Sequence, residues 1–169
     1  MNDSSRKCIY TAYHYLSYKD YSEKTLMRKL SRDFPKDTAA AAIKELRELG
    51  IINDSRYAAK CIRQLMFTKK LGETRVRREL LQRGLTEETI EAALNEFNEA
   101  SDYDPERMVR WFLEKNYTAE DLRDKDKLRK IYAQLTRRGF ETQLIKHCID
   151  DFDEIFDSEE TLENPDEDD

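Results

Sequence analysis

The sequence predicts an all-α fold, and three observations support that prediction. Glu, Lys, Arg, Leu and Ala, which are all good helix formers, dominate the chain. The 169 residues include only four glycines and three prolines, whereas the turns of a β-rich protein usually need more of both. No segment alternates apolar and polar residues for long enough to indicate a sheet.

One helical unit is repeated along the chain: Leu80–Leu85 resembles Leu135–Phe140 at an offset of 55 residues, and the apolar positions after them keep this register. An earlier copy surrounds Leu30 and lacks the glycine of the other two. Because short helices are marginally stable alone, stacked copies bury more apolar surface than one copy can. The sequence therefore predicts three tandem three-helix repeats in an elongated, curved array. The repeats are expected at residues 1–52, 53–100 and 101–157.

Capping residues indicate where the helices begin and end. Ser22 and Thr86 stand at N-cap positions, and Pro105 stands at a first helical position. Three helix ends are followed by a glycine, which can adopt the left-handed conformation needed there. These glycines are Gly50, Gly84 and Gly139. The expected helices span residues 5–17, 23–32, 37–49, 55–70, 73–83, 87–97, 105–116, 126–138 and 141–155.

Charge is divided unevenly between the body of the chain and its end. Residues 150–169 hold twelve acidic side chains and no basic one, whereas residues 1–149 hold 30 basic and 24 acidic side chains, a net of +6. This division suggests a basic binding body with an acidic tail, and residues 158–169 are expected to be disordered. The tail either increases solubility or competes with DNA for the basic body.

Several classes of protein are disfavoured by the sequence. No run of 18 apolar residues and no signal peptide are present, so the protein is expected in the cytoplasm. Cys8, Cys61 and Cys148 are odd in number and far apart, which favours buried thiols over disulfides or a zinc site. His14 and His147 are the only histidines, and no P-loop, nucleophile elbow or zinc-protease motif occurs. We therefore expect no enzyme, no cofactor and no bound metal.

The most basic stretch runs from Lys60 to Gly84, where eight basic residues stand against two acidic ones. Within it, Val76 and Leu80 mark the buried side of one helix, so Arg75 and Arg78 are expected to face solvent. An exposed arginine row can bind phosphates or the carboxylates of a partner protein. A solvated helix face with no binding role is an equally weighted alternative.

Five tyrosines are concentrated in the first repeat. Tyr13 is expected to pack on the same face as Ala12, whereas Tyr10 and Tyr18 are expected at the surface, where they could stack on bases. Core packing is the favoured role for these tyrosines as a group. Trp111 is expected to pack in the core of the third repeat.

The chain resembles the RecX family over about residues 12–152. Leu49–Ala58 is similar to the family's repeat junction, a leucine-glycine pair followed by an acidic turn and an aromatic-alanine pair. Gly72–Leu85 resembles its most typical segment, which runs from a glycine through a basic-aliphatic step and a Glu-Leu pair to a closing basic-glycine-aliphatic sequence. Tyr21–Glu23 with Arg28–Leu30 is similar to the family's first-repeat pattern.

The resemblance implies three tandem three-helix repeats and a role in regulating RecA, the ATP-driven filament that pairs DNA strands in recombination and repair. RecX-like proteins lie in the groove of that filament, inhibit ATP hydrolysis and strand exchange, and block extension or promote disassembly. The implied partners are the RecA filament and, weakly or indirectly, single- or double-stranded DNA, with no membrane; a monomer is expected. The candidate contact residues are Lys69, Lys70, Arg75, Arg77, Arg78, Arg83, Lys127, Arg129, Lys130, Arg137 and Arg138.

Two rival interpretations remain open. A stand-alone nucleic-acid-binding helical protein would hold phosphates through the second repeat, and its affinity would fall steeply with salt. A helical-repeat scaffold would instead recruit another protein through an apolar groove anchored by tyrosines of the first repeat, and that binding would largely survive salt.

Overall fold

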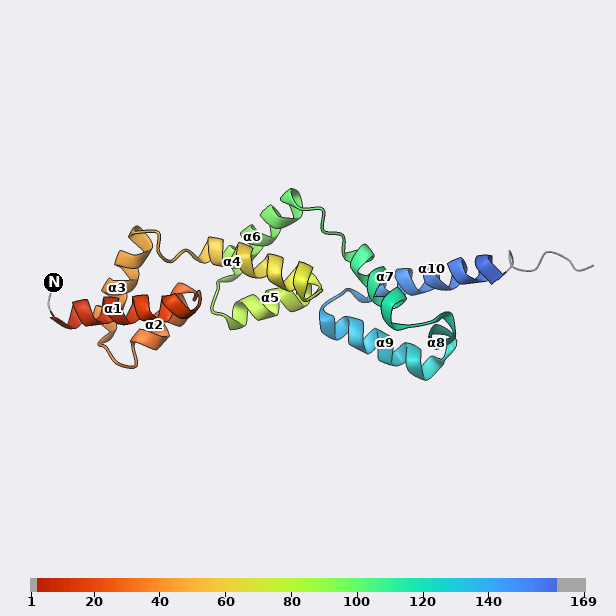
Figure 1. The fold of residues 1–169 in the computed structure, drawn as a ribbon, viewed down its shortest axis with the longest axis horizontal. Coiled ribbons are helices and arrows are strands. Elements are labelled where there is room, and N and C mark those ends of the chain that lie inside the picture. Colours follow the sequence, from red (N-terminus) through yellow and green to blue (C-terminus); the bar gives the residue numbers. More distant parts are fainter. Residues whose placement is uncertain (1–2, 161–169) are drawn as a thin grey trace, which may run out of the picture. The chain divides into compact units, whose positions relative to one another are not determined.

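The computed structural model describes residues 3–160, apart from the side chains of residues 119 and 153–160. This part of the chain forms ten α-helices and one π-helix and contains no strand (Figure 1), which confirms the all-α prediction. None of these described helices is long and apolar enough to span a membrane. In chain order the elements are α1 (Asp3–Tyr18), α2 (Glu23–Leu30), α3 (Lys36–Glu48), α4 (Asp54–Arg63), η1 (Gln64–Thr68), α5 (Glu73–Gln82), α6 (Glu87–Ala100), α7 (Pro105–Asn116), α8 (Ala119–Arg123), α9 (Lys125–Arg138) and α10 (Thr142–Glu160).

Packing divides the chain into two units. Unit 1 consists of the residues up to Leu65 together with Arg77–Ser101, so it holds α1 to α4, the second part of α5, and α6. Unit 2 combines Met66–Val76 with the residues from Asp102 onward, so it holds the end of η1, the first turn of α5 and the segment between them, together with α7 to α10. The repeat boundaries after residues 52 and 100 stay a prediction.

The first repeat of unit 1 closes around a core between α1, α2 and α3. Ala39 and Ala42 face inward from α3, and their small side chains let the neighbouring helices approach closely. The leucines contributed by α2 and α3 are fully buried, and each such side chain stabilises the fold by about 1.5–3 kcal/mol. The buried residues of this core are Cys8, Ala12, Leu26, Leu30, Ala39, Ala42, Ile43, Leu46 and Ile52.

The tyrosines of α1 lie mostly outside this core. Tyr10 and Tyr18 are each 75% exposed, as expected, but Tyr13 is 42% exposed and does not pack beside Ala12. The prediction for Tyr13 is wrong because Cys8 and Ala12 define the buried stripe of α1, and Tyr13 is turned away from it by one residue of helical rotation, about 100°.

The predicted helix over residues 55–70 is interrupted. α4 ends at Arg63 and continues as the π-helix η1 to Thr68, after which Lys70 adopts a left-handed conformation with φ of 55°. Within η1, Leu65 and Met66 face inward, and each is at most 1% exposed. Cys61, Ile62, Leu65 and Met66 are all buried and keep the spacing of an ordinary helix, which is why the periodicity did not indicate the change.

The start of α2 holds the end of α5 within unit 1. Ser22 caps α2 by accepting a hydrogen bond from the Thr25 amide at 3.2 Å, which confirms the predicted cap. The Ser22 hydroxyl also donates to the Arg83 carbonyl at 2.5 Å, and the Thr25 hydroxyl donates to the same oxygen at 2.8 Å. Gly84 follows in the left-handed conformation, and a Cβ there would approach both hydroxyls to 2.9 Å. Ser22 itself is fully buried.

Unit 2 has its own core between α7, α8, α9 and α10. The short helix α8 was not predicted; it begins with a capping box between Thr118 and Asp121 and buries Leu122. α10 continues to Glu160, beyond the predicted end at residue 155, and the remainder of the predicted acidic tail lies outside the described residues. The buried residues of the core are Val109, Phe112, Leu113, Leu122, Ile131, Leu135, Phe140, Ile145, Cys148, Ile149 and Phe152.

The end of α9 meets the start of α5 backbone to backbone, within unit 2. The Gly72 amide donates to the Arg138 carbonyl at 2.9 Å. Gly139 has a φ of 93°, and a Cβ there would overlap the backbone and side chain of Arg75. A Cβ on Gly72 would overlap the Gly139 carbonyl in turn. Positive φ values confirm the left-handed conformations predicted for Gly50, Gly84 and Gly139.

We expect Gly139→Ala to lower the free energy of unfolding of unit 2 by about 3 kcal/mol or more, because steric overlap adds to the strain of a left-handed alanine. Gly50→Ala is the matched control: Gly50 has a φ of 67°, and a Cβ there would meet no atom within 4 Å, so only about 1–2 kcal/mol should be lost. Denaturation followed by circular dichroism compares the two variants, and Trp111, the single tryptophan, reports on unit 2. Equal losses would contradict the backbone contact.

Candidate binding surfaces

The arginines at and after α5 differ in what they contact. Arg78 is exposed and forms no ion pair within the described part of the chain. Arg77 donates to Glu91 at 2.5 Å, and this hydrogen bond lowers the pKa of the Glu91 carboxyl. Arg75 was predicted to face solvent like Arg78, but it is only half-exposed because its backbone and Cβ lie against Gly139. Arg78 is therefore the arginine of α5 best placed to meet a partner.

Arg83 follows α5 and points inward rather than outward. Its guanidinium donates to the Cys61 sulfur at 2.9 Å, and its carbonyl accepts the hydroxyls of Ser22 and Thr25. The residue is half-buried. A filament or nucleic acid lying on the outer face of α5 would not reach this guanidinium directly.

Arg138 also has a structural role, in unit 2. Its guanidinium donates to the carbonyls of Lys69 and Lys70 at 3.2 Å each and lies 4.8 Å from the centre of the Phe112 ring. These contacts hold the segment before α5 in place while Lys70 adopts its strained left-handed conformation. Arg138 thereby fixes the backbone from which the two lysine side chains emerge.

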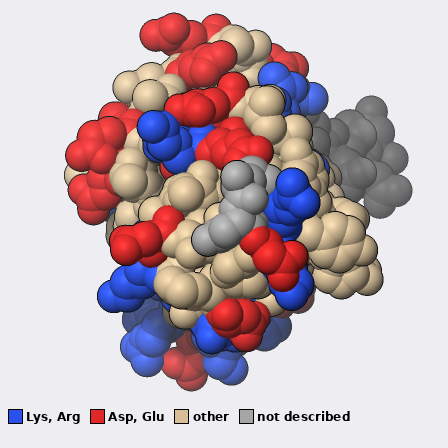
Figure 2. Space-filling model, turned by 90° about the vertical axis from the view of Figure 1, so that its left-hand side faces the viewer, with Lys and Arg blue, Asp and Glu red and all other residues tan. Residues whose placement is uncertain are grey.

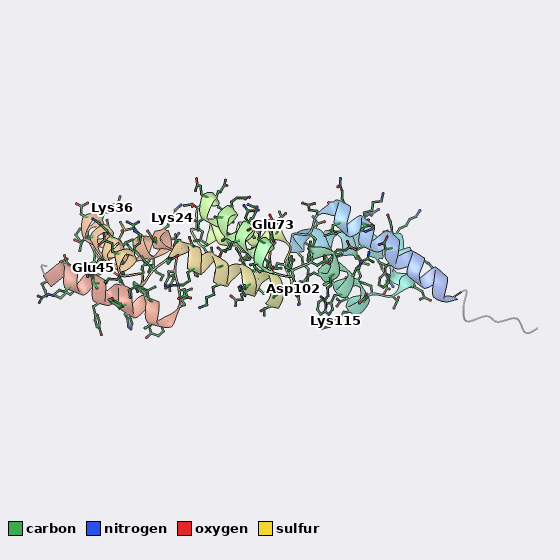
Figure 3. The ribbon with its side chains drawn as sticks, turned by 90° about the horizontal axis from the view of Figure 1, so that it is seen from above. Lys24, Lys36, Glu45, Glu73, Asp102 and Lys115 are labelled. Atoms are coloured by element: carbon green, nitrogen blue, oxygen red, sulfur yellow. The ribbon has the colours of Figure 1, made fainter. Side chains whose placement is uncertain are left out.

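Trp111 is exposed, and the prediction that it packs in the core is wrong. Its side chain is 39% exposed, with the Lys70 ammonium 5.5 Å and the Lys115 ammonium 4.8 Å from the ring centre. Figure 3 shows Lys115 extending from α7. Helical spacing could have revealed this, since Trp111 stands roughly 150° around α7 from the stripe centred on Val109. We call Lys69, Lys70, Trp111 and Lys115 the Trp111 patch.

The Trp111 patch combines an aromatic ring with basic side chains, the two features with which proteins bind single-stranded nucleic acids. An exposed indole offers a flat surface on which a base can stack, and ammonium groups beside it can contact the backbone phosphates. The cation–π contacts keep the lysines close to the ring before any ligand arrives. Lys69 is exposed and precedes Lys70 in the chain.

The remaining basic candidates lie on α9. Lys127 pairs with Asp121 at 2.5 Å, and Arg129 lies 3.9 Å from Asp126 with both side chains strongly exposed. Arg137 donates to the carbonyl of Ala133 in its own helix. Lys130 is exposed and has no ion pair among the described residues. On α9, Lys130 is thus the most available cation, whereas Lys127 is engaged by an acid.

One cluster of unit 2 has the composition of a metal site. Ligand atoms of Glu106, His147 and Asp151 lie within 4.8 Å of one another. However, Arg110 donates to Glu106 at 2.8 Å and also to Asp151, and these hydrogen bonds raise the pKa of the guanidinium. A metal cation would have to displace a permanently charged arginine, so the cluster acts as an ion-pair network joining α7 to α10.

The three cysteines are buried free thiols, as predicted. Burial raises the pKa of Cys8, and it raises that of Cys148 to about 11, so both remain protonated and unreactive at neutral pH. His14 lies edge-on to Tyr18 on the exposed side of α1. No nucleophile paired with a base is found among the described residues.

Charge alone does not mark a binding surface. The face shown in Figure 2 carries acidic and basic side chains interspersed rather than a field of one sign. The partners of each cation therefore decide which of the predicted candidates can meet a ligand, and this criterion selects Arg78 in unit 1 and, in unit 2, Lys130 and the Trp111 patch.

Comparison with known proteins finds relatives that match most of the chain. Residues 8–46 match the family model for RecX, first three-helix domain, and residues 53–94 match that for RecX, second three-helix domain. Regulatory protein RecX of Clostridioides difficile is 29% identical over 147 residues, which cover 85% of this chain and 68% of the relative. Regulatory protein RecX of Prosthecochloris aestuarii is also 29% identical, with 89% and 97% covered. The crystal structure of RecX from Lactobacillus salivarius matches with a TM-score of 0.77 at 28% identity, covering 90% of this chain and 99% of that one.

The pairing of Lys127 with Asp121 makes a testable prediction. Hydrogen bonds from Lys127 and from the Thr118 amide lower the pKa of Asp121 from its usual 3.8 to about 2. The pair therefore stabilises the folded state above the usual aspartate pKa, and this stabilisation is lost as the pH falls through about 2. In Lys127→Met, the Asp121 pKa measured by carbon-detected NMR should rise towards 3.8, whereas Lys130→Met should leave it much closer to the wild-type value. An unchanged Asp121 in Lys127→Met would mean that Lys127 is free for a partner.

Proposed function

We propose that this chain, which belongs to the RecX family of regulatory proteins, binds the RecA recombinase filament on DNA and inhibits its ATP hydrolysis, strand exchange and extension. Members of the family are regulatory and non-catalytic. The observation that carries the proposal is the match of both three-helix domains, since it spans the basic segment around α5. RecA as the partner is inferred from the family.

In this proposal, Arg78 is the contact of unit 1. It stands on α5 after Val76 and before Leu80, two fully buried residues that fix the helix against the core. A rigid helix presents an arginine at low entropic cost, and a guanidinium without an internal acid can pair bidentately with a carboxylate or a phosphate. The filament offers both groups, on its protein surface and on its DNA.

Arg78→Glu tests this contact without disturbing the core. We expect wild-type protein, added well below one per RecA monomer, to inhibit ATP hydrolysis by the cognate RecA on single-stranded DNA. Arg78→Glu should need about tenfold more protein, because reversing one interfacial charge costs on the order of 1.4 kcal/mol. Lys44→Glu is the control, since Lys44 is exposed on α3 and, within the described part of the chain, pairs only with Glu48 of the same helix.

The outcomes of this assay test the proposed function and the proposed contact residue separately. No inhibition by folded wild-type protein at any ratio would contradict filament regulation. Full inhibition by Arg78→Glu would keep the function but contradict the contact. Arg75 is left unchanged because it packs closely against Gly139, so that a substitution there would alter both folding and binding.

Direct binding of single-stranded DNA is the second candidate function, and the Trp111 patch favours it. Because Trp111 is the single tryptophan, its fluorescence reports on this patch alone. We expect an oligo-dT strand to quench it, with affinity falling as salt rises. Lys115→Gln should weaken binding, and Trp111→Leu, followed by anisotropy of labelled DNA, should weaken it about tenfold, in line with a stacking contribution of about 1–3 kcal/mol.

Tyr10→Leu is the control for this measurement, because Tyr10 is also aromatic and is more exposed than Trp111 but belongs to unit 1. An affinity that Trp111→Leu and Tyr10→Leu change equally would contradict a stacking role for the Trp111 patch.

A further inference from the structure

A cavity of about 580 Å³ lies in unit 1 between the first repeat and α4. Its walls include Lys19 and Asp20 from the segment after α1, Tyr57 and Lys60 from α4, and Arg83 from the end of α5. Its volume is within the range of small-molecule sites. None of the surfaces assigned above uses it.

The formal charges around the cavity leave an excess of two positive charges. Lys19, Lys60 and Arg83 contribute three cations against the one carboxylate of Asp20. Lys60 and Asp20 pair at 2.6 Å, and this hydrogen bond raises the pKa of Lys60. The side chains of Lys19 and Arg83 have no acid partner among the described residues, although the Lys19 ammonium lies 5.0 Å from the ring centre of Tyr21.

Arg83 is held in place before any ligand binds. Two hydroxyls fix its carbonyl, and its guanidinium donates to the Cys61 sulfur at 2.9 Å, a weak acceptor that leaves other donors of the group available. An anion bound beside this half-buried guanidinium would offset the cost of partly removing its charge from water. Tyr57 is half-buried next to it and hydrogen-bonds with Arg83 and Cys61, and burial raises the pKa of this phenol, which therefore stays neutral.

We propose that this cavity binds the phosphomonoester group of a small molecule such as a nucleoside 5′-monophosphate. A phosphomonoester carries a charge close to −2 at neutral pH, which matches the excess of two positive charges. Arg83 supplies fork-shaped donors, and Lys19 supplies a second cation. A phosphodiester, with a single negative charge, fits this charge balance less well. The proposal is independent of filament regulation and goes beyond it.

Calorimetric titration of the full chain at constant ionic strength tests the proposal with two matched probes. AMP should bind saturably with one site per chain, and cyclic AMP, its diester counterpart, should bind at least about tenfold more weakly because it lacks one charge. Lys19→Gln and Arg83→Gln should each weaken AMP binding by about tenfold or more. Lys44→Gln, which changes an exposed lysine outside the cavity, should have no effect.

Lys19→Gln keeps the test valid if Arg83→Gln proves unstable, because the Lys19 side chain is exposed and, among the described residues, its ammonium has no ion pair and lies over the Tyr21 ring. No saturable binding of AMP at millimolar concentration would overturn the proposal. Equal affinities for AMP and cyclic AMP, or an unchanged affinity in folded Lys19→Gln, would also overturn it. Displacement of AMP by an oligo-dT strand without a 5′-phosphate would assign the cavity to backbone phosphates instead of a small molecule.

Discussion

Both units depend on hydrogen bonds to a backbone carbonyl at the end of a helix, donated by side-chain hydroxyls in unit 1 and by a backbone amide in unit 2. Arg83 and Arg138 are equivalent positions of the repeat, and in each case the carbonyl accepts hydrogen bonds from the start of the middle helix one repeat earlier. A left-handed glycine follows each arginine, and its missing side chain leaves room for the hydroxyls of Ser22 and Thr25 at Gly84 and for the Arg75 backbone at Gly139. Because helices of this length are marginally stable alone, these contacts and the small cores beneath them hold the fold together. The guanidinium groups repeat the pattern, since Arg83 lies beside Tyr57 and Arg138 over the equivalent Phe112.

These contacts show that some basic residues of the chain stabilise its fold instead of facing a ligand. A sequence pattern of basic residue, glycine and aliphatic residue looks like a cationic binding motif, yet its arginines support the repeat structure. The cations left for ligands are those whose side chains leave the helices without an internal acid, such as Arg78 and Lys130, or those gathered around an exposed ring, as at Trp111. Binding and packing are therefore divided between different arginines and lysines within a few residues of each other.

Local signals in the sequence predicted much of this fold, and contacts between distant residues account for what was missed. The caps at Ser22 and Thr86 and the left-handed glycines depend on a few adjacent residues, so they could be read directly. The π turn at η1 and the inward turn of Arg83 depend on neighbours that are brought together only by folding. The sequence predicted the basic region around α5 as part of the candidate site. Only the packed structure shows which of its basic side chains are paired and which are unpaired. The exposure of Trp111 is the exception, since helical spacing alone would have shown it.

The sequence separation of these backbone contacts bears on how the chain assembles during synthesis. The Ser22 hydroxyl and the Arg83 carbonyl are 61 residues apart, and the contact between Gly72 and Arg138 likewise reaches back by about one repeat. A nascent repeat can dock as soon as its own middle helix has formed, using a site that the preceding repeat already displays, and it needs no residue that is still to be translated. These docking contacts can thus form in the direction of translation, whereas Met66–Val76 packs with residues that are translated later, from Asp102 onward.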